Sequence, residues 1–350
     1  MFSLFLLLAC RPSPDPSSGP TTPDDVPADT SSTTSTSTGA TGSTAATAAT
    51  GDTAPPRPVF DCSMVPVEPV STRILEGATG YHDVAFTGDG RIIGASRQNA
   101  HLNVADEKGN VSVLTPSVGL TEQMVWLPDG DLAVASYDEG IVRVTAAGGR
   151  VPIQPSIAAY GLILGPDEML YAADQSRVFR VDPVTGDTEV LLEPGALTRG
   201  DPRVIAFDLA YERMFIGTYV GSQGRIYVVD LDASYTPVGE PVVFVEGVGR
   251  GGYHDAITLD LCGYLYIPDY DTKTLFRVTP HGTVVQAYEV STGLINSDYP
   301  HGAEFGNGVG PWREDALYLP MPYNQNQVRE LVVGVPSRYA EMDAINRPSW

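Results

Sequence analysis

The chain has 350 residues and a formal net charge of −22, with 36 glycines and 29 prolines. This charge excludes binding to nucleic acid through a basic surface, because phosphate neutralisation requires clustered Lys and Arg. Hydrophobic residues make up 42% of the chain, which is enough for a packed core and excludes global disorder. The many glycines and prolines favour short strands joined by tight turns.

The N-terminal segment has the features of a targeting signal and a tether. Residues 1–9 are almost wholly apolar, too short to cross a bilayer, and end at Cys10 in a pattern that resembles a bacterial lipobox. Residues 30–50 contain only Thr, Ser, Ala and Gly, which cannot form a core. We therefore expect a lipoprotein signal peptide over 1–9, a lipidated Cys10 and a disordered linker over 10–58. The folded domain would then be tethered to a membrane of the bacterial cell envelope, in the periplasm or at the cell surface.

One pattern recurs six times after the linker: a polar residue, an apolar strand, a turn and a second strand. The repeats start at residues 82, 122, 160, 203, 255 and 301. They read, for example, HDVAFTGDGRIIGAS, EQMVWLPDGDLAVAS, YGLILGPDEMLYAAD and DAITLDLCGYLYIPDY. A period of about 40–50 residues is typical of the four-stranded blade of a β-propeller.

The last repeat lacks a fourth strand after residues 327–333, whereas residues 72–75 precede the first repeat in the phase of an outer strand. Pairing of these two segments would close the ring and remove a free strand edge. The sequence therefore predicts an all-β fold, a six-bladed β-propeller over residues 59–350 closed by an N-terminal outer strand. A seven-bladed ring would need a further repeat.

With Cys10 lipidated, Cys62 and Cys262 remain. Cys262 lies between the first two strands of the fifth repeat, and Cys62 precedes the closing strand, which must start at the same end of the propeller. We expect a disulfide between them, typical of an oxidising compartment. Two buried free thiols are the alternative.

The aligned repeats place one polar side chain at the entrance of each innermost strand. In chain order these are His82, Glu122, Tyr160, Arg203, Asp255 and His301. Innermost strands surround the channel of a propeller, so we expect the six side chains to meet at one end of it. A functional site is favoured over a solvated rim, because a rim would also contain Ser, Thr, Asn and Gly.

The repeats, and DAITLDLCGYLYIPDY at 255–270 in particular, resemble those of the gluconolactonase and senescence-marker-protein family of six-bladed propellers. The resemblance covers roughly residues 60–335 and implies one divalent cation at the channel mouth, held by a Glu, two Asn and an Asp. The corresponding residues here are His82, Tyr160, Arg203 and Asp255, of which only Asp255 matches. A calcium site of the family type is therefore not expected.

The substituted residues suggest a different metal site. His82, Asp255 and His301 offer imidazole and carboxylate ligands, which favour Zn, Mn or Fe over Ca. Tyr160, Arg203 and Glu122 are the candidate catalytic residues; Arg203, Tyr160 and the neighbouring His254 are the candidate substrate-binding residues. The alternative is a metal-free cluster in which Arg203 pairs with Asp255 and Glu122.

Two classes of function follow from this site. The first is an extracytoplasmic metal-dependent hydrolase or lyase, lactonase-like, acting on a small molecule at the channel mouth. The second is a non-enzymatic propeller that binds a ligand or a protein, and a surface scaffold is a weaker third. We expect a monomer without organic or nucleotide cofactor, in contact with the membrane only through its N-terminal lipid.

Overall fold

The computed structural model describes residues 60–66, 69–76, 82–96, 100–116, 118–219, 224–249, 253–290, 299–322 and 327–338. The signal peptide, Cys10 and the linker predicted for residues 1–58 lie outside this part of the chain. Among the described residues no helix has the length and apolar character needed to span a membrane.

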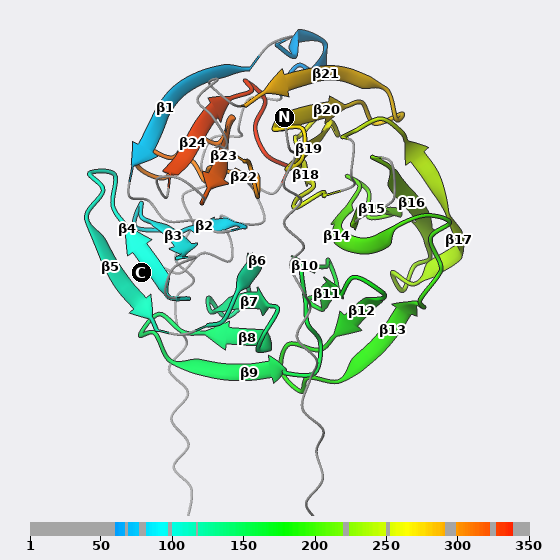
Figure 1. Ribbon diagram of the computed structural model, residues 1–350, viewed down its shortest axis with the longest axis horizontal. Coiled ribbons are helices and arrows are strands. Elements are labelled where there is room, and N and C mark those ends of the chain that lie inside the picture. Colours follow the sequence, from blue (N-terminus) through cyan, green and yellow to red (C-terminus); the bar gives the residue numbers. More distant parts are fainter. Residues whose placement is uncertain are drawn as a thin grey trace, which may run out of the picture. The chain divides into compact units, whose positions relative to one another are not determined.

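Six four-stranded antiparallel sheets are arranged around a central axis, which confirms the predicted six-bladed β-propeller (Figure 1). Blade 1 comprises β2 (Val84–Phe86), β3 (Ile92–Ala95), β4 (Leu102–Ala105) and β5 (Val111–Thr115). Blade 2 comprises β6 (Thr121–Trp126), β7 (Leu132–Ser136), β8 (Gly140–Val144) and β9 (Arg150–Gln154). Blade 3 comprises β10 (Gly161–Leu164), β11 (Leu170–Ala173), β12 (Val178–Val181) and β13 (Thr188–Leu192).

The second half of the ring repeats this order of strands from the axis outward. Blade 4 comprises β14 (Asp201–Phe207), β15 (Arg213–Tyr219), β16 (Ile226–Leu231) and β17 (Pro237–Val245). Blade 5 comprises β18 (Thr258–Leu259), β19 (Leu265–Asp269), β20 (Thr274–Val278) and β21 (Val284–Glu289). Blade 6 comprises β22 (Glu304–Phe305), β23 (Ala316–Met321), β24 (Gln327–Val332) and the N-terminal β1 (Val70–Glu76).

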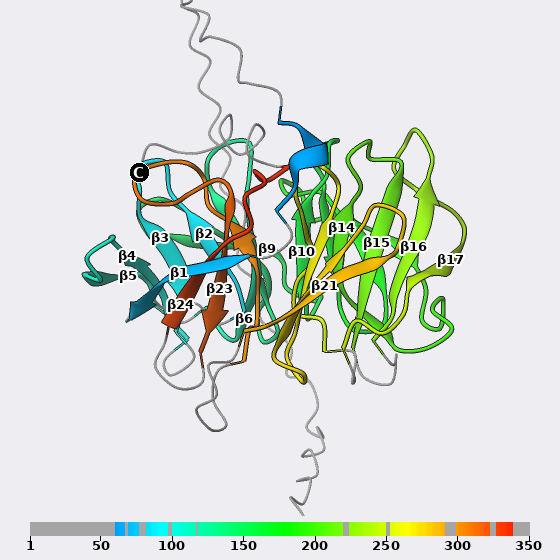
Figure 2. The same ribbon diagram turned by 90° about the horizontal axis from the view of Figure 1, so that it is seen from above.

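Ring closure by β1 confirms the predicted outer strand. β1 pairs antiparallel with β24, from Val70 opposite Val332 to Glu76 opposite Gln327. The two strands come from opposite ends of the domain and lie side by side in both views (Figures 1 and 2). Because β1 covers the outer edge of β24, the last blade has the same four strands as the others.

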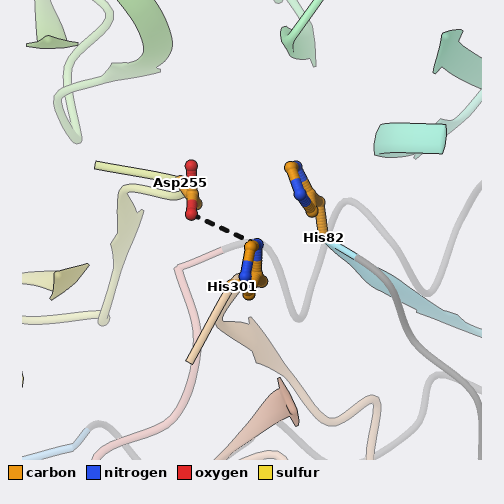
Figure 3. A group of neighbouring side chains, drawn as sticks. All are labelled: His82, Asp255 and His301. Atoms are coloured by element: carbon orange, nitrogen blue, oxygen red, sulfur yellow. Dashed lines mark ion pairs between the residues drawn. The ribbon is translucent and has the colours of Figure 1, made fainter. Parts of the chain in front are cut away.

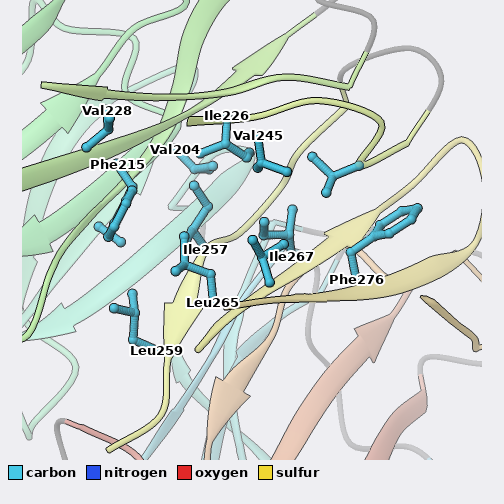
Figure 4. Packing of buried hydrophobic residues seen from close by; sticks show 13 residues of the cluster. Val204, Phe215, Ile226, Val228, Val245, Ile257, Leu259, Leu265, Ile267 and Phe276 are labelled. Carbon is cyan, nitrogen blue, oxygen red and sulfur yellow. The ribbon is translucent and has the colours of Figure 1, made fainter. Parts of the chain in front are cut away.

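The sequence of each strand reflects its distance from the axis. The second strand of blade 2 is buried at all five positions, whereas the outermost strand β9 is partly or fully exposed throughout. Apolar side chains of neighbouring blades pack against one another between the sheets. Between blades 4 and 5, Val204 and Phe215 share a core cluster with Ile257 and Leu265 (Figure 4).

Tight hairpins connect the first two strands of each blade. In blade 2 the turn of Leu127–Asp131 closes through a hydrogen bond of 2.9 Å from the Gly130 amide to the Leu127 carbonyl. Gly130 has φ of 88°, a conformation that glycine adopts without steric strain. These hairpins lie at the end of the propeller opposite the entrances of the innermost strands.

The predicted disulfide is present at that end. Cys62 begins the 3-10 helix η1 (Cys62–Met64) and is bonded to Cys262, with Cα atoms 5.6 Å apart. The carbonyl of Pro66 also accepts a hydrogen bond of 2.5 Å from Nη1 of Arg277. The disulfide thus joins the segment before β1 to blade 5, and a bond of this kind indicates an extracytoplasmic location.

Candidate functional site

Six polar side chains at the entrances of the innermost strands line one cavity of about 340 Å³. They are His82, Glu122, Tyr160, Arg203, Asp255 and His301, one from each blade. All six occupy the same place in the repeat, at or just before the first strand of the blade. The structure therefore brings together the residues that the aligned repeats predicted to meet at one end of the channel.

Five of these side chains form a closed loop of contacts, called here the polar ring. Nε of Arg203 donates a hydrogen bond of 2.7 Å to Oδ1 of Asp255, and its Nη2 lies 3.9 Å from Oε2 of Glu122. Oε2 of Glu122 contacts Nδ1 of His82, whose ring lies with its centroid 4.4 Å from that of His301. Nδ1 of His301 lies 3.3 Å from Oδ2 of Asp255, and this contact closes the loop (Figure 3).

Burial makes the charges of the polar ring interact strongly. Each of its five residues is only 4–6% exposed, so solvent screens their electrostatic interactions little. Burial alone would disfavour the charge of Arg203. The nearby carboxylates of Asp255 and Glu122 outweigh that effect and raise the pKa of Arg203 above its ordinary value. Arg203 is therefore a permanent cation held between two carboxylates.

Tyr160 lies beside the polar ring and packs on Arg203. The guanidinium carbon of Arg203 is 4.5 Å from the centroid of the Tyr160 ring, a cation–π contact. Burial and the charge of Glu122 raise the pKa of the Tyr160 hydroxyl, because both disfavour the phenolate. The hydroxyl consequently keeps its proton and can donate a hydrogen bond into the cavity.

His82, Asp255 and His301 point toward one another (Figure 3) and form the one group of potential metal ligands among the described residues. One ligand atom of each lies within 4.8 Å of the others. Ligands of tetrahedral zinc at about 2.1 Å are roughly 3.4 Å apart. The 3.3 Å between Oδ2 of Asp255 and Nδ1 of His301 already matches this separation. Two imidazoles and a carboxylate thus fit a divalent transition-metal ion after small side-chain shifts.

Tyrosines form the wall of the cavity above the polar ring. This tyrosine collar consists of Tyr137, Tyr160, Tyr219, Tyr253 and Tyr270. Tyr219 and Tyr253 meet edge to face with centroids 5.2 Å apart, and Arg203 also lies over the ring of Tyr219 at 4.9 Å. Aromatic faces above a charged floor suit a small molecule with both apolar and polar surface.

The sequence prediction included Tyr160 but missed the rest of the collar. Tyr137 follows β7 directly, Tyr219 is the last residue of β15, and Tyr270 follows β19 directly. The second strand of a blade returns to the end at which the first strand begins, so its last residue faces the same cavity. A recurring tyrosine at the end of the second strand was therefore a usable signal.

His254 does not line the cavity, although it precedes Asp255 in the chain. Its Nδ1 accepts a hydrogen bond of 3.2 Å from the amide of Thr218, and its Nε2 lies 2.7 Å from the carbonyl oxygen of Val248. Burial lowers the pKa of the imidazole, which favours the neutral form. Both ring nitrogens contact backbone atoms of other segments. His254 therefore does not face the cavity in which the predicted substrate-binding role would place it.

A second cavity of about 100 Å³ lies among the innermost strands. Val84, Leu162 and Ile257 line it, each two residues after a residue of the cavity. Asp83 is a buried acid in its wall, and its Oδ2 accepts a hydrogen bond of 2.9 Å from the Met124 amide. Burial raises the pKa of Asp83 to about 7. Gln123, Thr258 and Glu304 also line this cavity, so its wall is polar as well as apolar.

No family model matches the chain, and no curated protein matches it. Its structure is similar to that of the calcium-binding protein regucalcin from Agrobacterium tumefaciens, with a TM-score of 0.60 and 16% identity over 77% of this chain and 95% of that one. A gluconolactonase from Xanthomonas campestris gives a TM-score of 0.59 and 12% identity over 77% and 95% of the two chains. Virginiamycin B lyase from Staphylococcus aureus gives 0.52 and 13% identity over 74% and 98%. At these identities the likeness is one of fold.

Proposed function

We propose that this protein is an extracytoplasmic metal-dependent hydrolase or lyase that acts on a small molecule in the cavity of the polar ring. The observation that carries the proposal is the buried group of His82, Asp255 and His301 at the floor of that cavity. A divalent ion held by these three residues would supply Lewis-acid polarisation of a substrate carbonyl.

The remaining residues of the site have roles that follow from their contacts. The hydroxyl of Tyr160 keeps its proton and stabilises an oxyanion by donating a hydrogen bond. The tyrosine collar excludes water from the side and holds the apolar face of the substrate.

A lactone or a related ester is the substrate class that we propose. Gluconolactonase and virginiamycin B lyase share this fold, and both names denote enzymes that act on small molecules. A cavity of about 340 Å³ is within the range of sites for ligands of this size. The proposal depends on the site and takes only its substrate class from these similarities.

We also propose that the propeller is a monomer tethered to a membrane through a lipid on Cys10 and the linker that follows. The Cys62–Cys262 disulfide agrees with an extracytoplasmic domain. Growth with a labelled fatty acid, comparing the natural protein with Cys10→Ser, tests the tether. Label in the natural protein alone supports it, and equal labelling contradicts it.

Metal analysis tests the proposed site. Protein purified without a polyhistidine tag should contain about one equivalent of Zn, Mn or Fe. The double variant His82→Ala/His301→Ala should lose most of it, and His101→Ala, outside the cavity, should retain it. Equal metal content in all three proteins would rule out the proposed ligands.

A screen of lactones and esters with added Zn²⁺, Mn²⁺ and Ca²⁺ tests the activity. Hydrolysis or elimination should depend on Zn²⁺ or Mn²⁺ more than on Ca²⁺ because the site contains nitrogen ligands. It should also fall at least tenfold in His82→Ala/His301→Ala. Activity that survives both chelation and the double substitution would contradict a metal-dependent enzyme.

A second candidate function is ligand binding without a metal, and the contact of Arg203 with Asp255 favours it. Nε of Arg203 already occupies one oxygen of the only carboxylate among the three proposed ligands. In that case the metal-free protein binds its ligand through the tyrosine collar. Tyr137→Leu should then weaken binding measured by calorimetry, whereas Tyr137→Phe should not.

A further inference from the structure

Two residues contact the proposed metal ligands from outside the metal-binding group. Glu122 contacts Nδ1 of His82 through Oε2. Arg203 donates from Nε to Oδ1 of Asp255 at 2.7 Å, while the other oxygen, Oδ2, lies 3.3 Å from Nδ1 of His301. Within the polar ring, the three proposed ligands are thus contacted by one acidic residue, Glu122 at His82, and by one basic residue, Arg203 at Asp255.

We infer that Glu122 and Arg203 are positioning residues that set the metal affinity of this site in opposite directions. Glu122 raises the affinity by orienting His82, and Arg203 lowers it by adding a positive charge and by engaging Asp255. The inference rests on the proposed metal site and concerns its affinity.

Glu122 determines how His82 presents its ring. A ring nitrogen beside a carboxylate carries the proton, so contact of Nδ1 with Glu122 makes Nε2 the nitrogen with a lone pair. A histidine that ligates a metal commonly donates its other N–H to a carboxylate, and loss of that carboxylate costs about 10–100-fold in metal affinity. Glu122 is in the position of that outer carboxylate.

Arg203 acts against a bound cation for two reasons. An arginine side chain is always charged in proteins, and this one is only 6% exposed, so it repels a second cation with little screening. Its hydrogen bond to Oδ1 also satisfies the charge of Asp255 in the absence of metal. Without the guanidinium, the buried carboxylate of Asp255 would lack this counter-charge, and a metal ion would become its favoured partner.

The same contacts argue against a role of Arg203 as a clamp for an anionic substrate. The guanidinium of Arg203 lies between the side-chain carboxyl groups of Glu122 and Asp255, 3.9 Å and 2.7 Å from them. The guanidinium is therefore already neutralised inside the protein. It also packs on Tyr160 and Tyr219, which fixes its position below the tyrosine collar.

Titration of chelator-treated protein with Zn²⁺, using a chromophoric chelator as competitor, tests the inference. Glu122→Gln should bind Zn²⁺ at least tenfold more weakly than the natural protein. Arg203→Met, which keeps an unbranched side chain against the two tyrosines, should bind at least tenfold more tightly. A charge-matched control is the exposed pair of Glu139 and Arg150, 3.0 Å apart in blade 2; Glu139→Gln and Arg150→Met should change the affinity less than twofold.

Tighter Zn²⁺ binding by Arg203→Met cannot result from a disturbed fold, because a disturbed fold would weaken Zn²⁺ binding. Affinity that is unchanged or weaker in Arg203→Met, or unchanged in Glu122→Gln, overturns the inference and leaves the metal site standing. Zn²⁺ binding by Arg203→Met but not by the natural protein supports the inference while contradicting the proposed metal-dependent function. Absence of binding in both proteins overturns both.

Discussion

The rings of His82 and His301 lie with their centroids 4.4 Å apart and their planes inclined by 30°. The two histidines come from blades 1 and 6, which are distant in sequence and become neighbours when the propeller closes. Gly302 permits this approach, because a Cβ atom at residue 302 would overlap the carbonyl oxygen of His82. Backbone contact between the first and last blades therefore positions both histidines.

Substitution of Gly302 by Ala should destabilise the protein and separate the histidines. We expect a loss of about 1–3 kcal/mol in the free energy of unfolding, because the backbone at His82 must move. Urea unfolding measures this loss. Gly149→Ala is the matched control, since its nearest neighbour is the Thr145 hydroxyl at 3.1 Å on an exposed turn. Equal stability of the two variants would contradict the proposed role of Gly302.

Removal of β1 should cause association through blade 6. A variant that begins at Pro58 should be monomeric, whereas one that begins at Gly77 leaves the edge of β24 unpaired and should form oligomers or aggregates. The longer variant carries Cys62→Ser/Cys262→Ser and the shorter one carries Cys262→Ser, so that neither contains a free thiol. Light scattering after gel filtration measures the mass, and a stable monomer starting at Gly77 would show that closure by β1 is dispensable.

The disulfide should stabilise the propeller by restricting the unfolded chain. Cys62 and Cys262 are 200 residues apart, and in the chain-entropy model so long a loop contributes about 5 kcal/mol. Urea unfolding of the natural protein and of Cys62→Ser/Cys262→Ser measures the difference. Thiol labelling of the unfolded, unreduced protein should modify neither cysteine, and labelling of both would disprove the bond.

Asp260, in the turn that contains Cys262, should make stability depend on pH. Burial raises the pKa of its carboxyl above 3.8 in the folded state, although the Tyr264 amide and the Tyr266 hydroxyl donate to it at 3.0 Å. The folded protein therefore binds this proton more tightly. The stabilising contribution is complete below pH 3.8 and is lost as pH rises through the raised pKa.

The variant Asp260→Asn removes this contribution, so its stability relative to the natural protein should increase with pH. Urea unfolding between pH 4 and 8 measures the trend. Asp182→Asn serves as a control of opposite sign, because amides of Val184 and Thr185 lower the pKa of exposed Asp182. The contribution of Asp182 is present above its unfolded pKa and is lost as pH falls. Parallel trends in the two variants would contradict the assigned direction for Asp260.

The sequence by itself determined the architecture, because each blade is encoded locally. Six repeats, each with a polar residue, an apolar strand, a turn and a second strand, predict six four-stranded sheets. Residues 72–75 lie where the repeat pattern places the missing outer strand of the last blade. The aligned repeats also placed one polar residue of every blade at the cavity. The disulfide followed from the same topology, since Cys62 before the closing strand and Cys262 in the first turn of blade 5 lie at one end of the propeller.

Only the tertiary structure decided which of the predicted site residues contact one another and which do not face the cavity. Arg203 pairs with Asp255 across neighbouring blades, Glu122 contacts His82, and His254 directs its ring to the backbone at Thr218 and Val248. Three of the collar tyrosines, Tyr137, Tyr219 and Tyr270, lie at the ends of second strands, which the repeat pattern did not single out. Such contacts depend on side-chain rotamers chosen by packing between blades about 40–50 residues apart or farther, and a local pattern carries no information about that choice.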